Sequence, residues 1–278
     1  MLALLILLPW IVRAEAVTDV SCTPVPGSPC SAELCLLEPT GGYSRPTAWI
    51  SVPEAPVQRF RIHLHGWSQK PSGEALNPSY DFAWPSGKTP AARDALKMVL
   101  AYGLHRDVCE PSADTVIMPL SRGHVDDYKA LFKTPADFTE WKNAVTGMIR
   151  TQDLPWTLSA HSGGGAIAAQ AIDPDDTLLD RVILLDATYD PGTAAFFKTW
   201  VTRINDPLNP RTLEVVSVTS PTAKHSRSIS IPGSAEVDGF TRTVRTPAAT
   251  LIREIRNDQS FDHYSIVPAR WDTRQRRP

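Results

Sequence analysis

The residues best suited to chemistry lie in the run Ala160-His161-Ser162-Gly163-Gly164. An apolar segment, residues 156–160, precedes the serine, and a run of small residues follows it, which predicts a strand, a sharp turn and a helix. Small residues two before and two after the serine let the strand and the helix pass close together. The start of the helix also directs backbone N–H groups at developing negative charge. The pattern therefore predicts a serine nucleophile, Ser162, on a strand–turn–helix segment that we call the serine turn (residues 160–164).

Two other interpretations of the serine turn stay open. A glycine-rich connection between strand and helix needs no chemistry at all. A phosphate-binding loop is disfavoured, because the Lys-Ser/Thr ending of the Walker motif is missing.

A serine hydroxyl is a weak nucleophile at neutral pH and needs a base, which in turn needs an acid to orient it. His263 follows the last predicted helix and fits the chain order serine, acid, histidine, so we predict that it is the base. His225 is the rival, but Lys224 and Arg227 beside it would oppose its protonation.

The predicted acid is Asp186, at the carboxyl end of the predicted strand 181–185. Catalytic groups gather at that edge of open α/β sheets. Asp190 is the second choice, and Asp238 and Asp262 are weaker ones. Asp186 as a simple turn or capping aspartate is the alternative without function.

An oxyanion formed at the serine would need backbone donors. We predict the N–H groups of Gly163 and of Trp67, the latter in the loop that follows the strand 59–65. His65 at the end of that strand is expected to be a packed residue. The candidate substrate contacts are His161, Trp84 and His124. Ordinary loop packing explains Trp84 equally well, and a solvated loop position is favoured for His124.

Alternating strands and helices must position these residues. Strands are predicted at 48–52, 59–65, 115–120, 156–160, 181–185 and 212–218, with a short one possible at 228–231; helices are predicted at 90–102, 134–150, from 163 onward, at 192–204 and at 247–256. That alternation predicts an α/β fold with a mostly parallel central sheet flanked by helices.

Composition limits the classes of function. The chain has 278 residues, enough for one large α/β domain with a sizeable core. Its net charge of −2 gives no footprint for nucleic acid, which is not expected as a partner. No His-Glu-x-x-His or similar ligand cluster occurs, so neither a metal nor another cofactor is predicted.

The N-terminus predicts export. An apolar run from Leu2 to Val12 is too short for a span of about 20 residues and leads into Ala14-Glu15-Ala16, a small-x-small cleavage signal. We predict a signal peptide at 1–16, a single domain at 17–278, a secreted or periplasmic location and no stable membrane insertion after cleavage. A buried N-terminal strand or an uncleaved anchor is the alternative.

Four cysteines follow the predicted cleavage site: Cys22, Cys30, Cys35 and Cys109. An even number in an exported chain predicts two disulfides, with three pairings possible. Three of them lie in a Pro/Cys-rich lead at 17–46, which has too few apolar residues to form a core of its own. A zinc site is the second interpretation, although paired Cys-x-x-Cys spacing is missing.

The run His65-Gly66-Trp67, the serine turn, Asp186 and His263 together resemble the α/β-hydrolase superfamily over about residues 48–268. The resemblance implies an acid after the sixth or seventh sheet strand, and Asp186 would be the less common sixth-strand placement. It implies an exported serine hydrolase that cleaves a carboxylic ester of a small-molecule or cell-envelope substrate through an acyl-enzyme. The alternatives are an amidase or peptidase with the same residues, and a non-catalytic binding protein on this scaffold.

Overall fold

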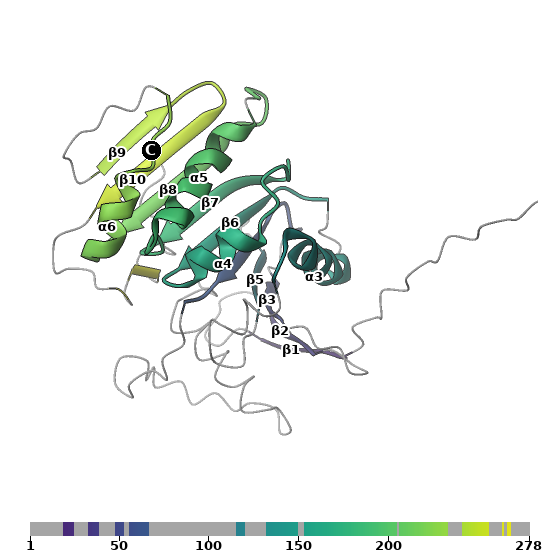
Figure 1. Cartoon of the computed structure of the whole chain (residues 1–278). Helices are drawn as coiled ribbons and strands as arrows, with labels where there is room; N and C mark the ends of the chain where they lie inside the picture. Colours follow the sequence, from purple (N-terminus) through teal and green to yellow (C-terminus); the bar gives the residue numbers. More distant parts are fainter. Residues whose placement is uncertain are drawn as a thin grey trace, which may run out of the picture.

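The computed structural model describes residues 19–24, 33–38, 48–52, 56–66, 115–119, 132–149, 153–204, 206–232, 241–255, 263 and 266–267. Within them the strands form one ten-stranded sheet in the order β1-β2-β3-β5-β4-β6-β7-β8-β10-β9 (Figure 1). The strands are β1 (Asp19–Pro24), β2 (Glu33–Glu38), β3 (Ala48–Val52), β4 (Phe60–Leu64), β5 (Thr115–Pro119), β6 (Trp156–His161), β7 (Leu179–Leu185), β8 (Arg211–Ser217), β9 (Thr241–Arg245) and β10 (Ala249–Ile255).

The centre of the sheet is parallel. β5, β4, β6, β7, β8 and β10 pair in parallel one after another, whereas β1, β2 and β3 at one edge and β9 at the other pair antiparallel. Every residue of β6 is buried, as expected for a central parallel strand covered on both faces. The predicted α/β fold with a mostly parallel central sheet is confirmed.

Four helices belong to the described part of the chain: α3 (Pro135–Met148), α4 (Gly164–Ala171), α5 (Pro191–Arg203) and α6 (Ser220–Ser226). α4 contacts both α3 and α5 and packs on β4 and β6, so these three helices are neighbours in one layer (Figure 1). Local sequence sets where two of them begin. Thr134 and Asp137 form a capping box at α3, and the Asp190 side chain accepts from the N–H of Thr193 at 2.8 Å at the start of α5.

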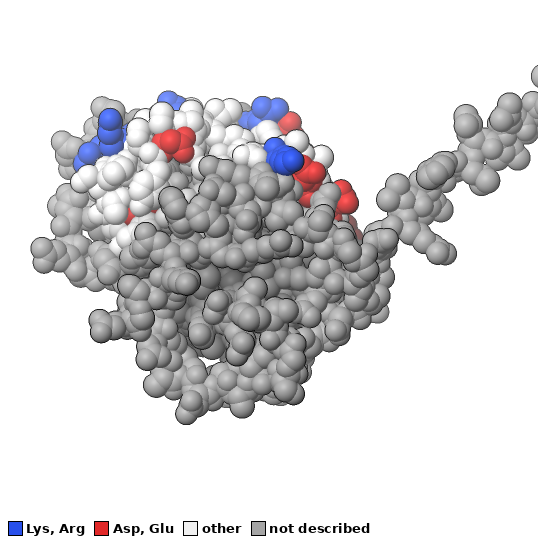
Figure 2. Space-filling model, turned by 60° about the horizontal axis from the view of Figure 1, so that its bottom comes forward, with Lys and Arg blue, Asp and Glu red and all other residues white. Residues whose placement is uncertain are grey.

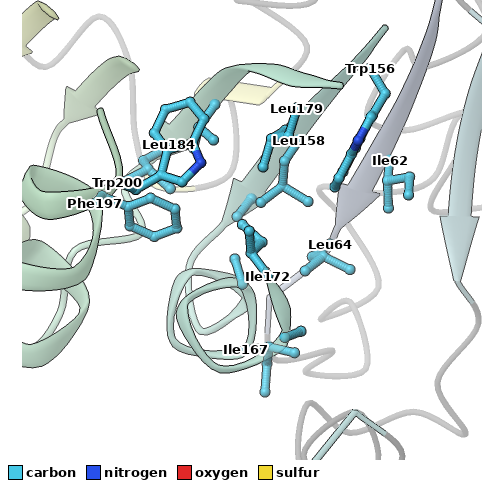
Figure 3. Packing of buried hydrophobic residues seen from close by; sticks show 14 of the residues in the cluster. Ile62, Leu64, Trp156, Leu158, Ile167, Ile172, Leu179, Leu184, Phe197 and Trp200 are labelled. Carbon is cyan, nitrogen blue, oxygen red and sulfur yellow. The ribbon is translucent and has the colours of Figure 1, made fainter. Parts of the chain in front are cut away.

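Buried aliphatic and aromatic side chains join the helices to the sheet. Figure 3 shows Ile167 of α4 near Leu64 of β4, and Trp200 of α5 near Leu184 of β7. All four residues are fully buried, so this contact region excludes water and fixes α4 over the parallel strands. The position of α4 matters because the helix begins directly after the candidate serine.

The predicted helix at 247–256 is wrong, because β10 occupies Ala249–Ile255. Apolar residues at 251, 252 and 255 fit helical spacing, but the segment pairs in parallel with β8 along its whole length and antiparallel with β9. A place between two strands gives each backbone group of β10 a partner, which outweighs the weak local preference.

Other differences are local. The possible strand at 228–231 is absent, and α6 lies just before it at Ser220–Ser226. β9 was not predicted, and β1 and β2 form within the segment that the sequence predicted only as a lead. The predicted helix 90–102 and the predicted signal peptide lie outside the described residues.

Arg211 at the start of β8 is a buried cation that connects β8 with the end of α5 and with the segment before β7. It is 2% exposed and donates to the carbonyl oxygens of Trp200 at 2.8 Å, Pro174 at 2.9 Å and Asp176 at 3.0 Å. We expect Arg211→Met to lower the free energy of unfolding by about 2–4 kcal/mol, because three carbonyls lose a charged donor. Urea unfolding measures the change.

Arg203→Met is the matched control. Arg203 pairs with Asp175, and both side chains are well exposed, at 45% and 61%. Solvent-exposed pairs contribute little, so its unfolding midpoint should stay near that of the unmodified protein. Equal effects of the two substitutions would contradict a structural role for the carbonyl contacts of Arg211.

Candidate active site

The predicted strand, turn and helix around Ser162 are all present, as β6, the serine turn and α4. Ser162 has φ 54°, in the left-handed region that non-glycine residues rarely adopt. Its N–H donates to the Leu185 carbonyl oxygen at 3.2 Å, and its own carbonyl accepts from the N–H of Gly165 at 3.1 Å. The turn therefore holds Ser162 in a strained conformation between the end of a strand and the start of a helix.

The end of β4 lies against this turn. A Cβ on Gly66 would stand 2.3 Å from the Cβ of Ser162, and a Cβ on Gly164 would stand 2.3 Å from the carbonyl oxygen of Leu64. Real Cβ atoms do not approach so closely, so only glycine fits at these two positions. The spacing of small residues in the sequence is thus explained by backbone contact.

The carboxyl ends of β4 and β6 lie at the point in the sheet where successive strands change from one side of β4 to the other. After β4 the chain passes to β5 on one side, and then returns to β6 on the other side of β4. Leu64 pairs with Ala160 in the β4–β6 register, so both strands end together. Open α/β sheets bind ligands at such a switch point, outside the carboxyl ends of the strands.

Gly165 provides a test of close packing at the serine turn. A Cβ there would lie 2.0 Å from the carbonyl oxygen of Ala187, whereas a Cβ on Gly147 in α3 meets nothing within 4 Å. We expect Gly165→Ala to lower the free energy of unfolding by about 2 kcal/mol or more, through strain on backbone atoms.

Gly147→Ala is the control in another helix of the same domain. It should leave stability unchanged or raise it by up to about 1 kcal/mol, because alanine is the better helix former. Thermal unfolding of both variants measures the contrast, and destabilisation by Gly147→Ala alone would refute the packing argument.

Asp186 follows β7 directly, has φ 46° and is 0% exposed. Its Oδ1 accepts from the N–H groups of Val218 and Thr219, at 3.0 and 3.1 Å, and from the hydroxyls of Thr219 and Thr222. Burial opposes ionisation of this carboxyl, but hydrogen bonds from His263, Thr222 and the two N–H groups outweigh burial and hold its pKa well below the ordinary value. Asp186 is therefore a carboxylate at neutral pH.

The structure brings His263 onto this carboxylate. Nδ1 of His263 lies 2.6 Å from Oδ2 of Asp186. A carboxylate only accepts, so Nδ1 is the donor and carries the proton of the neutral ring. Nε2 on the opposite side of the ring is then the nitrogen that takes up a second proton. The His263 side chain is 21% exposed, whereas that of Asp186 is fully buried.

His161 is placed differently from the substrate contact expected of it. Its side chain is 1% exposed, and Nε2 lies 2.7 Å from the backbone carbonyl oxygen of His263, to which it donates. The two rings lie 4.5 Å apart between centroids. Burial is the main cause that lowers the pKa of His161 to about 3, so the ring is neutral. His161 therefore holds His263 beside the serine turn.

Tyr189 was not singled out from the sequence. Its hydroxyl lies 3.3 Å from Oδ2 of Asp186 and 3.2 Å from Nδ1 of His263, and its pKa also responds to a side-chain contact with Ser162. The residue is 39% exposed. Its only sequence signal is a position three residues after Asp186, and an aromatic residue in a strand-exit loop has no pattern that marks it as functional.

The remaining candidates separate into two groups. Gly163 stands at the N-cap of α4, where helices leave N–H groups without intrahelical acceptors. Asp190, the second choice for the acid, caps α5, and His225 lies on α6. His65 is 2% exposed, as expected of a packed residue. The candidates outside the described residues are Trp67, Trp84, His124, Asp238, Asp262, Cys30 and Cys109.

Two other kinds of feature are absent from the part of the chain that the structure describes. No group of three or more His, Cys, Asp or Glu side chains could hold a metal ion there. None of the helices found there is long and apolar enough to cross a bilayer. On the described part of the face in Figure 2, Lys and Arg are interspersed with Asp and Glu.

The fold and the site define an α/β protein whose candidate active site combines a serine at a strand–helix turn with a hydrogen-bonded aspartate–histidine pair. No protein-family model matches the chain, and no curated protein matches it significantly.

Solved structures do match. An uncharacterised protein from Capnocytophaga ochracea is 10% identical, with a TM-score of 0.43 over 92% of this chain and 63% of that one. The dienelactone hydrolase from Anabaena variabilis is 9% identical, with a TM-score of 0.40 over 70% and 78%. The carboxylesterase CesB from Bacillus subtilis is 10% identical, with a TM-score of 0.37 over 82% and 84%.

Proposed function

We propose that this chain is a serine hydrolase that cleaves carboxylic esters. One observation supports the proposal above the others: the aspartate–histidine hydrogen bond, at 2.6 Å, is held beside a serine in a strained strand–helix turn. That arrangement contains a nucleophile, a base and an orienting acid at the carboxyl edge of a parallel sheet. A glycine-rich turn without chemistry would need neither the buried carboxylate nor the histidine.

The proposed reaction proceeds through an acyl-enzyme. Oγ of Ser162 attacks the ester carbonyl carbon while Nε2 of His263 takes the hydroxyl proton. Asp186 stabilises the resulting imidazolium through Nδ1. The tetrahedral intermediate collapses, the C–O bond to the alcohol breaks, and His263 returns the proton to the leaving alkoxide. Water then attacks the acyl-enzyme by the same sequence and releases the acid and the free serine.

The oxyanion of each tetrahedral intermediate needs donors that are already in place. We propose the N–H of Gly163, at the start of α4, as one of them. The N–H of Trp67 remains the proposed second donor. Gly66 supports this choice because it directly precedes Trp67 in the chain and lies against the serine turn, where a Cβ on it would stand 2.3 Å from that of Ser162.

Labelling with a fluorophosphonate tests the proposal. This reagent phosphonylates an activated serine, so the unmodified protein should carry one label, and peptide mass mapping should place it on Ser162. Ser162→Ala should remove the label. His263→Ala should slow labelling by about 10³-fold or more, because the base is lost.

His225→Ala is the matched control, since it removes the rival base on α6. This variant should label at the rate of the unmodified protein. Labelling that survives His263→Ala but is lost in His225→Ala would transfer the role of base to His225. An unlabelled but folded protein would favour a binding protein on this scaffold.

Esters and amides are separated by their leaving groups. Alcohols leave more readily than amines, which must be protonated, and the proposed activity is on esters. Acyl p-nitrophenyl esters and the matching p-nitroanilides give a direct comparison. A larger rate enhancement over the uncatalysed reaction for the anilides than for the esters would favour an amidase or peptidase instead.

Export is proposed together with this activity. Cys35 is 5% exposed and disulfide-bonded, and Cys22 stands directly opposite it in the β1–β2 register. Opposed residues of antiparallel strands have the Cα separation that a disulfide needs. We infer a Cys22–Cys35 bridge, as suits an oxidising compartment. Non-reducing peptide mapping of protein recovered from outside the cytoplasm should find this bridge and an N-terminus at Val17.

A further inference from the structure

The aspartate–histidine pair is part of a larger network that includes an exposed phenol. Oδ2 of Asp186 has two neighbours, Nδ1 of His263 at 2.6 Å and the hydroxyl of Tyr189 at 3.3 Å. The same hydroxyl lies 3.2 Å from Nδ1, and the two rings meet edge to face with centroids 6.1 Å apart. Tyr189 therefore contacts both members of the pair with one oxygen.

Proton positions in this network follow from chemistry. The carboxylate has no proton to give, so both Nδ1–H of His263 and O–H of Tyr189 point at Oδ2. The phenol oxygen keeps lone pairs for a longer contact with Nδ1–H. Burial and the Asp186 charge raise the pKa of Tyr189 to about 12, so the phenol keeps its proton and remains a donor at working pH.

We propose that Tyr189 is a positioning residue that acts through Asp186 and His263, fixing the plane of the carboxylate and sharing the oxygen that holds the imidazole. Oδ1 of Asp186 is already held by the N–H groups of Val218 and Thr219, which follow β8. These donors restrict the position of Oδ2 less than that of Oδ1, because the carboxylate can still turn while Oδ1 keeps its hydrogen bonds. A second donor at Oδ2 removes that freedom. The inference rests on the proposed function, since it assigns a role within that site.

Sharing one oxygen also has an electrostatic consequence. The Tyr189 hydroxyl donates to Oδ2 of Asp186, the same oxygen that stabilises a protonated His263. The phenol therefore competes with the imidazolium for that oxygen. Among the described residues, the groups that face His263 include Asp186 from the end of β7 and neutral His161 from the end of β6. Removing the phenol hydroxyl leaves Oδ2 to the imidazole alone, which favours the protonated ring.

Tyr189→Phe in the full-length mature protein tests this role, because the ring stays and only the hydroxyl is removed. We expect the fluorophosphonate labelling rate on its high-pH plateau to fall about tenfold, as for loss of one hydrogen bond to a charged group. We also expect the acid limb of the rate–pH profile to move to higher pH by about half a unit.

Two comparison variants separate this role from packing. Thr222→Val removes a hydroxyl donor from Oδ1, away from the imidazole, and should lower the plateau with a smaller displacement of the acid limb. Thr199→Val removes an exposed hydroxyl that bonds only within α5, and should leave both quantities unchanged. A Tyr189→Phe profile identical to that of the unmodified protein would overturn the proposal.

A second readout is independent of reactivity. Proton NMR should show a downfield Nδ1–H resonance that Asp186→Asn removes and Tyr189→Phe shifts, if the three groups form one network. A resonance unaffected by Tyr189→Phe would overturn the inference about Tyr189 while labelling of Ser162 still supported the hydrolase. Absence of labelling with the shift present would overturn the hydrolase and keep the network.

Discussion

Ser162→Ala is expected to lower ester hydrolysis by about 10⁴-fold or more, to a rate set by binding and backbone donors alone. The reason is that the proposed acyl-enzyme forms on this hydroxyl, which stands directly before the start of α4. Turnover of a p-nitrophenyl ester by purified protein measures the loss. A variant that retains more than a few per cent of the activity would contradict the proposed nucleophile.

The same position predicts a gain in stability from a different substitution. Ser162 is held at φ 54°, a conformation that costs a non-glycine residue about 1 kcal/mol. Ser162→Gly should therefore be inactive yet unfold at higher urea concentration than Ser162→Ala, which keeps the strain. Equal stabilities for the two variants would mean that the turn relaxes once the hydroxyl is gone.

Acid sensitivity is the second large expected effect. His63, His65 and His161 are at most 2% exposed, and burial is the main cause that lowers the pKa of each. The pKa of His65 falls from 6.5 to about 4, and that of His161 to about 3. All three rings are thus neutral in the folded state over a range in which an unfolded chain would protonate them.

The sign follows from proton binding. Below pH 6.5 the unfolded state binds protons that the folded state excludes, so stability is fully present above that pH and falls as the pH is lowered towards 4 and then 3. Each histidine contributes a slope of about 1.4 kcal/mol per pH unit, and the three together about 4 kcal/mol per unit. His65 alone contributes about 3 kcal/mol over its full window.

Urea unfolding at a series of pH values from 7.5 to about 4.5 measures this slope. His65→Gln should reduce it by about one third, because one of the three buried rings is removed. Thr199→Val, which replaces an exposed side chain on α5 that does not titrate, is the comparison and should leave the slope unchanged. A stability that is flat with pH in the unmodified protein would show that the buried rings already carry protons when folded.

Much of the site follows from local sequence. Small residues around Ser162, an apolar run before it and the order serine, aspartate, histidine were enough to predict the turn and to select Asp186 and His263. The prediction works because close backbone contact excludes side chains at Gly164 and because parallel strands end at one edge. The catalytic roles of these residues remain proposals that labelling tests.

Other features depend on contacts between residues distant in sequence. Tyr189 and His161 acquire their places only because His263, more than seventy residues away, folds back onto them, at separations of 74 and 102 residues. The apolar spacing of β10 fits the helical period as well as the strand period, so the segment taken alone predicts a helix. Pairing with the edge of β8 makes it a strand.

The difference between the features that local sequence predicts and those that only the tertiary structure determines has a physical basis. Local sterics and periodicity, which act within a few residues, determine the alternation of strands and helices and the sharp turn at Ser162. Burial and hydrogen bonding across the sheet determine the rest: six parallel strands side by side, a carboxylate surrounded by donors from the segment after β8, and buried neutral histidines. These depend on which elements become neighbours, and neighbours in space are not encoded within any one segment.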